Sequence, residues 1–255
     1  MSKQNKPRIL LFDIETSPIL GAVWGLWEQD VIKVIDDWHM LSFSYKWLDE
    51  KYIHTVSLPD FKTVYKKNKK DDSALCLALW QLFDEADIII AHNGDQFDIK
   101  KANARFIIHG YNPPSSYLTI DTKKIAKKYF KFDSNSLKDL ARYFGVSQKA
   151  DAGGISTWLG CMSGDKKAWK HMVEYNKQDV RVLEDVYLAM RPYMKTHPVL
   201  KDRNEFTCPK CTSVNIQRRG YERTVGGTEY QRYQCQSCGG WSRSRLSEKH
   251  KQKIR

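Results

Sequence analysis

The feature that most constrains the fold is an apolar run, residues 8–14 (Arg-Ile-Leu-Leu-Phe-Asp-Ile), that contains an aspartate near its end. A continuous apolar run of this length predicts a buried strand. Side chains alternate along a strand, so Asp13 and Glu15 are expected on the same face. Two carboxylates are costly to bury unless a positive group pairs with them, and hard divalent cations such as Mg²⁺ or Mn²⁺ suit oxygen ligands. Because Asp-x-Glu alone is also common on surface strands, the prediction of a metal site needs further carboxylates.

Strand and helix patterns alternate along the first three quarters of the chain. The further strand-like segments are residues 40–47, 52–57, 87–92 and a strand end at 119–122. Helical patterns cover residues 73–84, 98–109, 137–144 and 166–191, and a lysine-rich helix is expected after Thr122. This alternation predicts an α/β domain. The early hairpin, with a turn at Asp49-Glu50, predicts a mixed sheet and not an all-parallel one.

Boundary residues and loops complete this prediction. Ser134 or Ser136 is expected to cap the helix at 137–144, and Gly145 stands where a C-terminal glycine is favoured. Residues 149–164 are small and glycine-rich, which predicts a loop near the substrate with Trp158 as its apolar anchor. The lysine-rich stretch at 66–70 is predicted to be a solvated loop, with phosphate contact as the alternative.

A second carboxylate follows a predicted turn within residues 92–98 (His-Asn-Gly-Asp-Gln-Phe-Asp). The Asn93-Gly94 pair is a turn signal, and Asp98 falls near the start of the next helix. Asn93 has a simpler interpretation as a turn residue, and Phe97 as a core residue.

A third carboxylate lies on the long helix, within residues 175–180 (Tyr-Asn-Lys-Gln-Asp-Val). Tyr175 and Asp179 are four residues apart, so they share one face of the helix. The tyrosine hydroxyl is therefore in a position to orient a water beside the aspartate. Alone, this spacing is equally typical of an amphipathic helix with a core tyrosine and a surface aspartate.

Together and in this order, the motifs resemble the DEDDy group of 3′→5′ exonucleases, which share a ribonuclease H-like fold. The resemblance covers about residues 8–192, and the spelling is most similar to the exonuclease domains of B-family polymerases and their free-standing bacterial and phage relatives. It implies a mixed five-stranded sheet flanked by helices. Asp121-Thr122 and residues 136–141 match further stretches of such exonucleases and support the fold. The histidine-type variant of the family is disfavoured, because Glu174 occupies the position of its histidine and His171 lies elsewhere.

The resemblance also implies the site and its chemistry. Two Mg²⁺ or Mn²⁺ ions would be bound by Asp13, Glu15, Asp98 and Asp179. One ion would activate water with help from Tyr175, and the other would stabilise the leaving 3′ oxygen. Asn93 and Phe97 are carried over as nucleic-acid contacts.

Four of the six cysteines form two Cys-x-x-Cys units, Cys208-Pro-Lys-Cys211 and Cys235-Gln-Ser-Cys238. Paired units of this kind predict one structural zinc ion with four thiolate ligands. The strand-like segments 215–221 and 230–234 flank Gly226-Gly227, which predicts a hairpin and, with the cysteines, a zinc ribbon. Two disulfides are the alternative, which a cytosolic location disfavours.

The basic charge of the chain is concentrated after residue 194. Residues 195–255 hold 14 Lys+Arg and 5 Asp+Glu (+9), whereas the rest of the chain, whose total is +12, accounts for +3. A segment of this charge attracts polyanions, although a solubilising tail is the simpler alternative. Within the ribbon, we expect arginines and an aromatic residue to contact nucleic acid, namely Arg218, Arg219, Arg223, Arg232, Trp241 and Arg243.

The predicted domains are 1–196 (exonuclease), 204–243 (zinc ribbon) and 244–255 (a basic flexible tail). The predicted function is metal-dependent 3′→5′ hydrolysis of single-stranded or frayed DNA ends, with the ribbon assisting binding. The alternatives are a nucleic-acid-binding adaptor with little turnover, and a structure-selective endonuclease or an RNA exonuclease on the same fold. No apolar run of membrane-spanning length and no signal-peptide region are found, so a cytoplasmic protein of a bacterial or phage-infected cell, without a membrane partner, is expected.

Overall fold

The computed structural model describes residues 7–27, 30–146, 153–198 and 206–247. Two compact units divide the chain, one formed by Arg8–Val186 and the other by the chain from Tyr187 onward. The domain boundaries expected from the sequence differ from this division and stay predictions. Most of the expected basic tail, residues 248–255, lies outside the described residues. No described helix has the length and apolar character needed to cross a bilayer.

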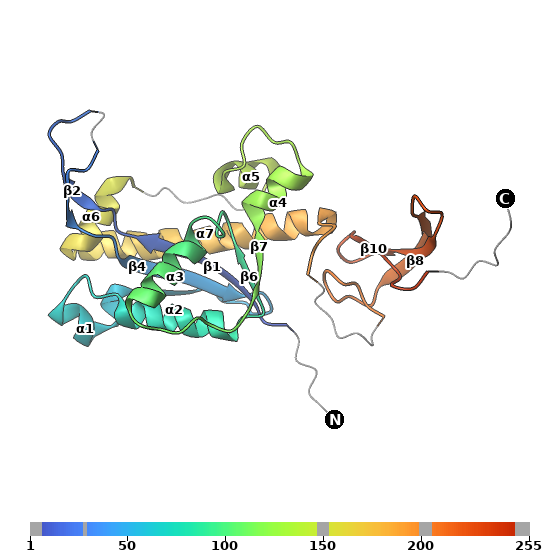
Figure 1. Ribbon diagram of the computed structural model, residues 1–255, viewed down its shortest axis with the longest axis horizontal. Coiled ribbons are helices and arrows are strands. Elements are labelled where there is room, and N and C mark those ends of the chain that lie inside the picture. Colours follow the sequence, from blue (N-terminus) through green and yellow to red (C-terminus); the bar gives the residue numbers. More distant parts are fainter. Residues whose placement is uncertain (1–6, 28–29, 147–152, 199–205, 248–255) are drawn as a thin grey trace, which may run out of the picture. The chain divides into compact units, whose positions relative to one another are not determined.

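A mixed five-stranded sheet forms the centre of the first unit (Figure 1). Its strands are β1 (Ile9–Thr16), β4 (Met40–Trp47), β5 (His54–Ser57), β6 (Ile88–Ala91) and β7 (Leu118–Asp121). The order is β5-β4-β1-β6-β7, in which β1, β4 and β5 pair antiparallel while β6 is parallel to both β1 and β7. The predicted fold class, a ribonuclease H-like mixed sheet, is therefore confirmed.

Seven α-helices are described, and five of them match predicted helices. They are α1 (Lys62–Lys67), α2 (Ser73–Glu85), α3 (Asp98–Ile108), α4 (Thr122–Tyr129), α5 (Leu137–Phe144), α6 (Ile155–Ser163) and α7 (Lys166–Met190). The helix expected after Thr122 is α4. At α5 the predicted boundaries are confirmed, since the Ser136 hydroxyl accepts a hydrogen bond from the amide of Asp139 and Gly145 ends the helix with φ of +63°.

The alternation of side chains along β1 separates the apolar core from the polar face. Phe12 packs edge-to-face on Phe83 of α2, with ring centroids 5.0 Å apart, in the main apolar cluster. Asp13 lies one residue further along the strand and contacts α7. The same alternation on β4 places Phe43 in the apolar cluster and Ser42 against α7. One face of the central strands thus supports the fold, and the other presents polar groups to α7.

The predicted loop at 149–164 is wrong where the structure describes it, because residues 155–163 form α6. Trp158 and Cys161 contribute to the apolar cluster, a helical spacing that the glycines obscured. Gly160 lets α6 approach α7 closely, since a Cβ there would lie 2.6 Å from the Cβ of Ala168. Gly164, at φ of +91°, ends the helix. Residues 149–152 of the predicted loop lie outside the described residues.

The stretch at 66–70, predicted to be a loop, is helical in its first part. Lys66 and Lys67 form the last turn of α1 and are exposed. Phe61 and Tyr65 pack against the apolar cluster, and this packing stabilises a helix too short to persist alone. The prediction of a solvated position is right, and the prediction of a loop is wrong for these two lysines.

An unpredicted hairpin arm, formed by β2 (Leu20–Ala22) and β3 (Lys33–Asp36), leaves the sheet directly after β1 (Figure 1). Its base is closed by a backbone hydrogen bond of 2.9 Å from the Ser17 amide to the His39 carbonyl oxygen. Large apolar side chains are exposed along it, including Trp24 at 87%. These side chains are exposed and add nothing to the core. Their apolar character therefore does not indicate a packed element.

A buried ion network joins β4, α2 and α3 around Asp72. This carboxylate accepts hydrogen bonds from the amide of Met40 (2.8 Å) and from Nη2 of Arg105 (2.5 Å), and its Oδ1 lies 2.7 Å from Nε2 of His109. Burial raises the pKa of Asp72, but Arg105 and the Met40 amide outweigh it, so the pKa lies below its usual value. Cys76 completes a group with metal-ligand character, yet the Arg105 guanidinium already occupies the carboxylate. The group is therefore an ion-pair network.

Asp72→Ala is expected to lower the free energy of unfolding by about 3–5 kcal/mol, because it leaves the partly buried Arg105 without its partner. Chemical denaturation at pH 7 measures this loss. Since the folded-state pKa of Asp72 is depressed, its contribution exists above the ordinary aspartate pKa and disappears as the pH falls through the lowered value. The difference between wild type and variant should therefore shrink in acid. A difference that persists unchanged to pH 2 would contradict this account, and the exposed Asp49→Ala is the control.

The second unit contains an antiparallel sheet of β8 (Ile216–Arg223), β9 (Glu229–Cys235) and β10 (Trp241–Arg243) in the order β10-β9-β8. The predicted hairpin is confirmed as β8 and β9. Gly227, at φ of +80°, lies in the turn between them, where a left-handed residue is needed. This small sheet has little core of its own, as expected for a ribbon held by a metal.

Candidate active site and zinc centre

Three carboxylates converge at the end of β1. Asp13 and Glu15 come from the strand and Asp179 from α7, and their ligand oxygens all lie within 4.8 Å of one another. Asp179 is 2% exposed and the two strand carboxylates are half-buried. Three like charges this close and this poorly hydrated need a cation between them, and oxygen-only ligands suit Mg²⁺ or Mn²⁺. The residues present therefore fit a divalent metal.

Asn176 holds one of these carboxylates in place, and sequence reasoning gave it no role. Its Nδ2 donates to Oδ2 of Asp13 (2.7 Å) and to the Asp13 carbonyl oxygen (3.2 Å). Its Oδ1 accepts a hydrogen bond of 3.3 Å from the hydroxyl of Ser42 on β4. The sequence indicates this role only by spacing, since the side-chain amide of Asn176 is three residues before Asp179 and therefore on nearly the same side of the helix.

Asp98, the fourth predicted ligand, begins α3 next to β1. It is buried, and its Oδ1 accepts a hydrogen bond of 3.2 Å from the amide of Ile14. Ile14 is the residue between Asp13 and Glu15 on the strand. Burial raises the pKa of Asp98 to about 7, and the charges of Asp121 and Asp179 contribute to the rise. Asp98 is not within the 4.8 Å group, so the structure brings three predicted ligands together and places the fourth beside them.

Asp121 is a fifth carboxylate at this end of the sheet. Its Oδ1 caps α4 by accepting from the amides of Lys123 (3.0 Å) and Lys124 (3.2 Å), and it also accepts from the amide of Asn93 (3.0 Å). Its Oδ2 is buried and has no hydrogen-bond partner among the described residues. The sequence indicated Asp121-Thr122 as fold support, and its proximity to Asp98 could not be predicted from spacing.

Asn93 and Phe97, predicted to contact nucleic acid, lie in the turn before α3. Asn93 has φ of +66°, and its carbonyl oxygen accepts from the amides of Gln96 (3.1 Å) and Phe97 (3.0 Å). The turn interpretation of Asn93 is thus right for its backbone, while its contact with nucleic acid stays a prediction. Phe97 is 42% exposed, so it is not a core residue.

Tyr175 lies one helical turn before Asp179, as its spacing predicts. Its ring is largely buried and packs edge-to-face against Trp158 of α6, with centroids 6.1 Å apart. Packing of this kind fixes the direction of the ring and therefore the place of its hydroxyl. The predicted anchor Trp158 thus supports a predicted site residue.

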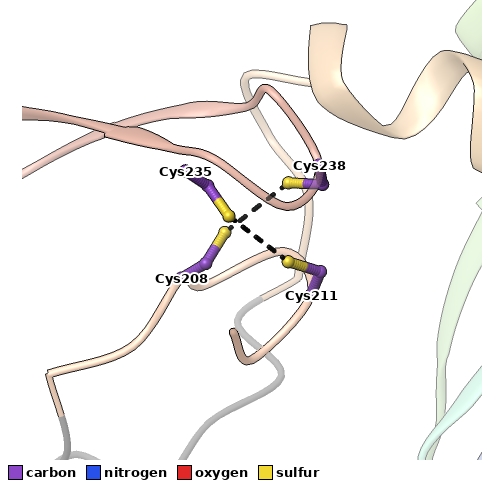
Figure 2. A group of neighbouring side chains, drawn as sticks. All are labelled: Cys208, Cys211, Cys235 and Cys238. Atoms are coloured by element: carbon purple, nitrogen blue, oxygen red, sulfur yellow. Dashed lines mark hydrogen bonds between the residues drawn. The ribbon is translucent and has the colours of Figure 1, made fainter. Parts of the chain in front are cut away.

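The four cysteines of the second unit form a compact group (Figure 2). The sulfur of Cys208 lies 3.8 Å from that of Cys238, and the sulfur of Cys211 lies 3.6 Å from that of Cys235. With Zn–S bonds of about 2.3 Å, the edge of a ZnS₄ tetrahedron is about 3.8 Å. All four cysteines are free thiols, far outside disulfide bonding distance. The group therefore fits one zinc ion.

The two Cys-x-x-Cys loops have the same backbone design. In each, a residue with positive φ follows the second cysteine, namely Thr212 (+60°) and Gly239 (+73°), and its amide donates to the carbonyl oxygen of the first cysteine over 2.9 Å. Gly240 permits close approach, because a Cβ there would lie 3.3 Å from the sulfur of Cys238. Burial opposes ionisation of Cys235, but the amides of Cys238 and Ser237 outweigh it and lower its pKa to about 7. Backbone dipoles thus favour a thiolate at Cys235, whereas burial raises the pKa of Cys208 and of Cys211.

Two of the arginines predicted to contact nucleic acid are held within the ribbon. Arg223 pairs with Glu229, and Arg243 pairs with Glu222 over 2.9 Å. Arg243 also lies over the ring of Tyr230, 4.3 Å from its centroid. These contacts orient the two guanidinium groups and leave them partly exposed.

The remaining predicted ribbon contacts are solvent-exposed. Arg218 and Arg219 lie on β8, and Arg232 lies over the ring of Trp241 with its guanidinium carbon 4.9 Å from the centroid. An arginine stacked on an exposed tryptophan is a common nucleic-acid-binding feature. Nothing in the structure tests these contacts, which stay predictions.

Comparison with known proteins agrees with the fold. The family model of the RNase H superfamily matches residues 36–191, and the chain belongs to this superfamily. The structure is similar to a family B DNA polymerase from the hyperthermophilic archaeon Pyrobaculum calidifontis, with a TM-score of 0.52, 14% identity, and coverage of 74% of this chain and 26% of the polymerase. No curated protein matches. The chain spans about a quarter of the polymerase, so the similarity concerns the fold alone. Superfamily membership and the acidic group support a metal-dependent nuclease that acts on nucleic acid.

Proposed function

We propose that this protein is a DEDDy-type 3′→5′ exonuclease that hydrolyses the terminal phosphodiester bond of DNA. The observation that carries the proposal is the convergence of Asp13, Glu15 and Asp179 at the end of β1. Asp98 lies beside them and accepts a hydrogen bond from the amide of Ile14, the residue between Asp13 and Glu15. Four carboxylates from three different elements have no structural reason to meet unless a cation binds there. A ribonuclease H-like fold with this acidic centre favours phosphodiester hydrolysis.

Each group has a separate role in the proposed mechanism. Two Mg²⁺ or Mn²⁺ ions, when bound, neutralise the phosphate and favour ionisation of the attacking water. Asp13, Glu15 and Asp179, with Asp98 beside them, would hold these ions. Tyr175 positions the attacking water through its hydroxyl, and the packing of Trp158 keeps the ring in place. Asn176 is a positioning residue that fixes the rotamer of Asp13.

Asn176→Ala is expected to raise the Mn²⁺ concentration needed for half-maximal hydrolysis by about 10–100-fold, because outer hydrogen bonds to a metal ligand contribute affinity of this order. Saturating Mn²⁺ should restore most of the rate. A titration of initial rate against Mn²⁺ measures both effects. Gln178→Ala, which removes an amide from the same helix, is the control. Equal metal requirements in the two variants would refute the positioning role.

Single-stranded or frayed DNA ends are the substrate we propose, and RNA is the alternative for the same centre. The ribbon, with its exposed Arg218 and Arg219, is proposed to assist binding, since basic and aromatic side chains together favour single strands. One structural zinc ion, held by the four cysteines, would maintain this module.

Linear and circular forms of one single-stranded DNA, incubated with Mn²⁺, separate the proposal from its alternatives. Degradation of the linear form alone is expected, because an exonuclease needs an end. Cleavage of the circle would indicate a structure-selective endonuclease. Tight binding without hydrolysis of either form, and without hydrolysis of RNA, would indicate an adaptor.

A further inference from the structure

A strongly basic surface, here called the α4–α5 surface (residues 122–146), lies within the first unit. It holds seven Lys+Arg and two Asp, a net charge of +5, although residues 1–194 together carry only +3. Acidic residues elsewhere in residues 1–194 offset this positive charge, so the net charge of that part of the chain does not reveal it. Lys127, Lys128 and Lys131 are exposed, whereas Thr122 and Ala126 form the buried side of α4.

A column of aromatic rings stands between α4 and α5. Phe130 stacks on Phe132, with centroids 5.2 Å apart and an interplanar angle of 19°, and Phe132 stacks on Tyr143, at 5.1 Å and 12°. Phe144 meets the side of the column edge-to-face. Tyr143 stands at one end of the column, is 38% exposed, and has the guanidinium of Arg142 5.1 Å from its ring centroid. Aromatic pairs favour both stacked and edge-to-face contacts, and here the stacked column leaves the ring of Tyr143 partly exposed at its end.

The surface is continuous with the candidate active site. Asp121 caps α4 and binds the amide of Asn93, and Nδ1 of His92 lies 2.9 Å from the hydroxyl of Thr122. Lys124 pairs with Asp95 over 2.7 Å. The segment that supplies Asp98 is therefore fastened to the start of α4. From there α4 extends about 12 Å at 1.5 Å per residue.

We propose that the α4–α5 surface binds single-stranded nucleic acid and is the part of the nuclease unit that holds the strand beside the active site. Lys127, Lys128 and Lys131 contact its phosphates, and Tyr143 stacks on an unpaired base. Charge selects a polyanion, and a ring face is useful only to a base that is not already stacked in a duplex. The inference rests on the proposed function for its biological sense, but it concerns binding and not hydrolysis.

Fluorescence anisotropy of a labelled single-stranded oligonucleotide with the full chain, without added divalent metal, tests the phosphate contacts. Lys127→Ala/Lys128→Ala should reduce the slope of log K against log salt by about 1.4, since each single-strand contact contributes about 0.7. Lys166→Ala/Lys167→Ala removes an equally exposed lysine pair at the start of α7 and should leave the slope unchanged. Equal slopes for the two double variants would overturn the proposal in favour of a merely solvated helix.

Tyr143→Ala tests the stacking. It should weaken binding of the single strand by roughly 5- to 150-fold, while Tyr143→Phe retains it, because stacking needs the ring and not the hydroxyl. Equal weakening of duplex binding would contradict single-strand recognition. If neither wild type nor any variant hydrolyses DNA while these binding effects are still observed, the exonuclease proposal is refuted and the proposed binding role of the α4–α5 surface is retained. Normal hydrolysis with no binding effect in either variant would refute the surface alone.

Discussion

Asp179→Asn is expected to reduce the rate of metal-dependent DNA hydrolysis by about 10³-fold or more and to raise the melting temperature of the metal-free protein. The first effect follows because a bound metal ion stabilises the charge that develops in the transition state by several kcal/mol, and the ion is lost with its ligand. Each 1.36 kcal/mol is a factor of ten in rate. The second follows because Asp179 is 2% exposed and lies within 4.8 Å of the carboxylates of Asp13 and Glu15. Without metal, these like charges oppose folding.

Asp185→Asn makes the same chemical change on the same helix and is the matched control. It should hydrolyse DNA like wild type, and Mn²⁺ should raise its melting temperature as it does for wild type. The Mn²⁺-dependent shift should be nearly absent in Asp179→Asn. Wild-type turnover in Asp179→Asn would remove the metal assignment, whatever the melting temperatures show.

Removal of zinc is expected to unfold the ribbon and to leave the unit formed by Arg8–Val186 folded. Structural zinc contributes about 10–16 kcal/mol of apparent binding free energy in zinc-finger peptides, far more than a three-stranded sheet with so small a core can supply. Chelation, or Cys208→Ser, should therefore expose residues 206–247 to protease at 25 °C. Metal analysis should find one zinc ion per wild-type chain.

Cys161→Ser is the control for the zinc experiment, because Cys161 is buried in the first unit and is not a member of the four-cysteine group. Its zinc content should equal that of wild type. A ribbon that stays protease-resistant after complete chelation would contradict a structural zinc site. So would a stoichiometry of zero in a folded wild-type chain.

The elements that the sequence predicted well are those with a single dominant local signal. The apolar run at 8–14 became β1, and Ser136 with Gly145 marked both ends of α5. The spacing of Tyr175 and Asp179 predicted their shared helix correctly, because i and i+4 geometry is local.

What the sequence could not provide depends on partners distant in the chain. Asn176 resembles any polar helix residue until Asp13 and Ser42, more than 130 residues earlier, are placed beside it. The glycines of residues 149–164 predict a loop, whereas residues 155–163 form a helix whose apolar spacing the glycines obscure. The positive charge of residues 122–146 does not show in the net charge of residues 1–194, and its connection to the site depends on contacts such as the cap of α4 at Asp121 and the pair of Lys124 with Asp95.

Digestion of a 5′-labelled single-stranded DNA oligonucleotide with Mn²⁺ or Mg²⁺, beside the variant Asp179→Ala, tests the central claim most directly. The account predicts a descending ladder of labelled products shortened from the 3′ end, present with the wild-type chain and absent with the variant. Immediate release of the labelled 5′ nucleotide, or an equal ladder with Asp179→Ala, would contradict it.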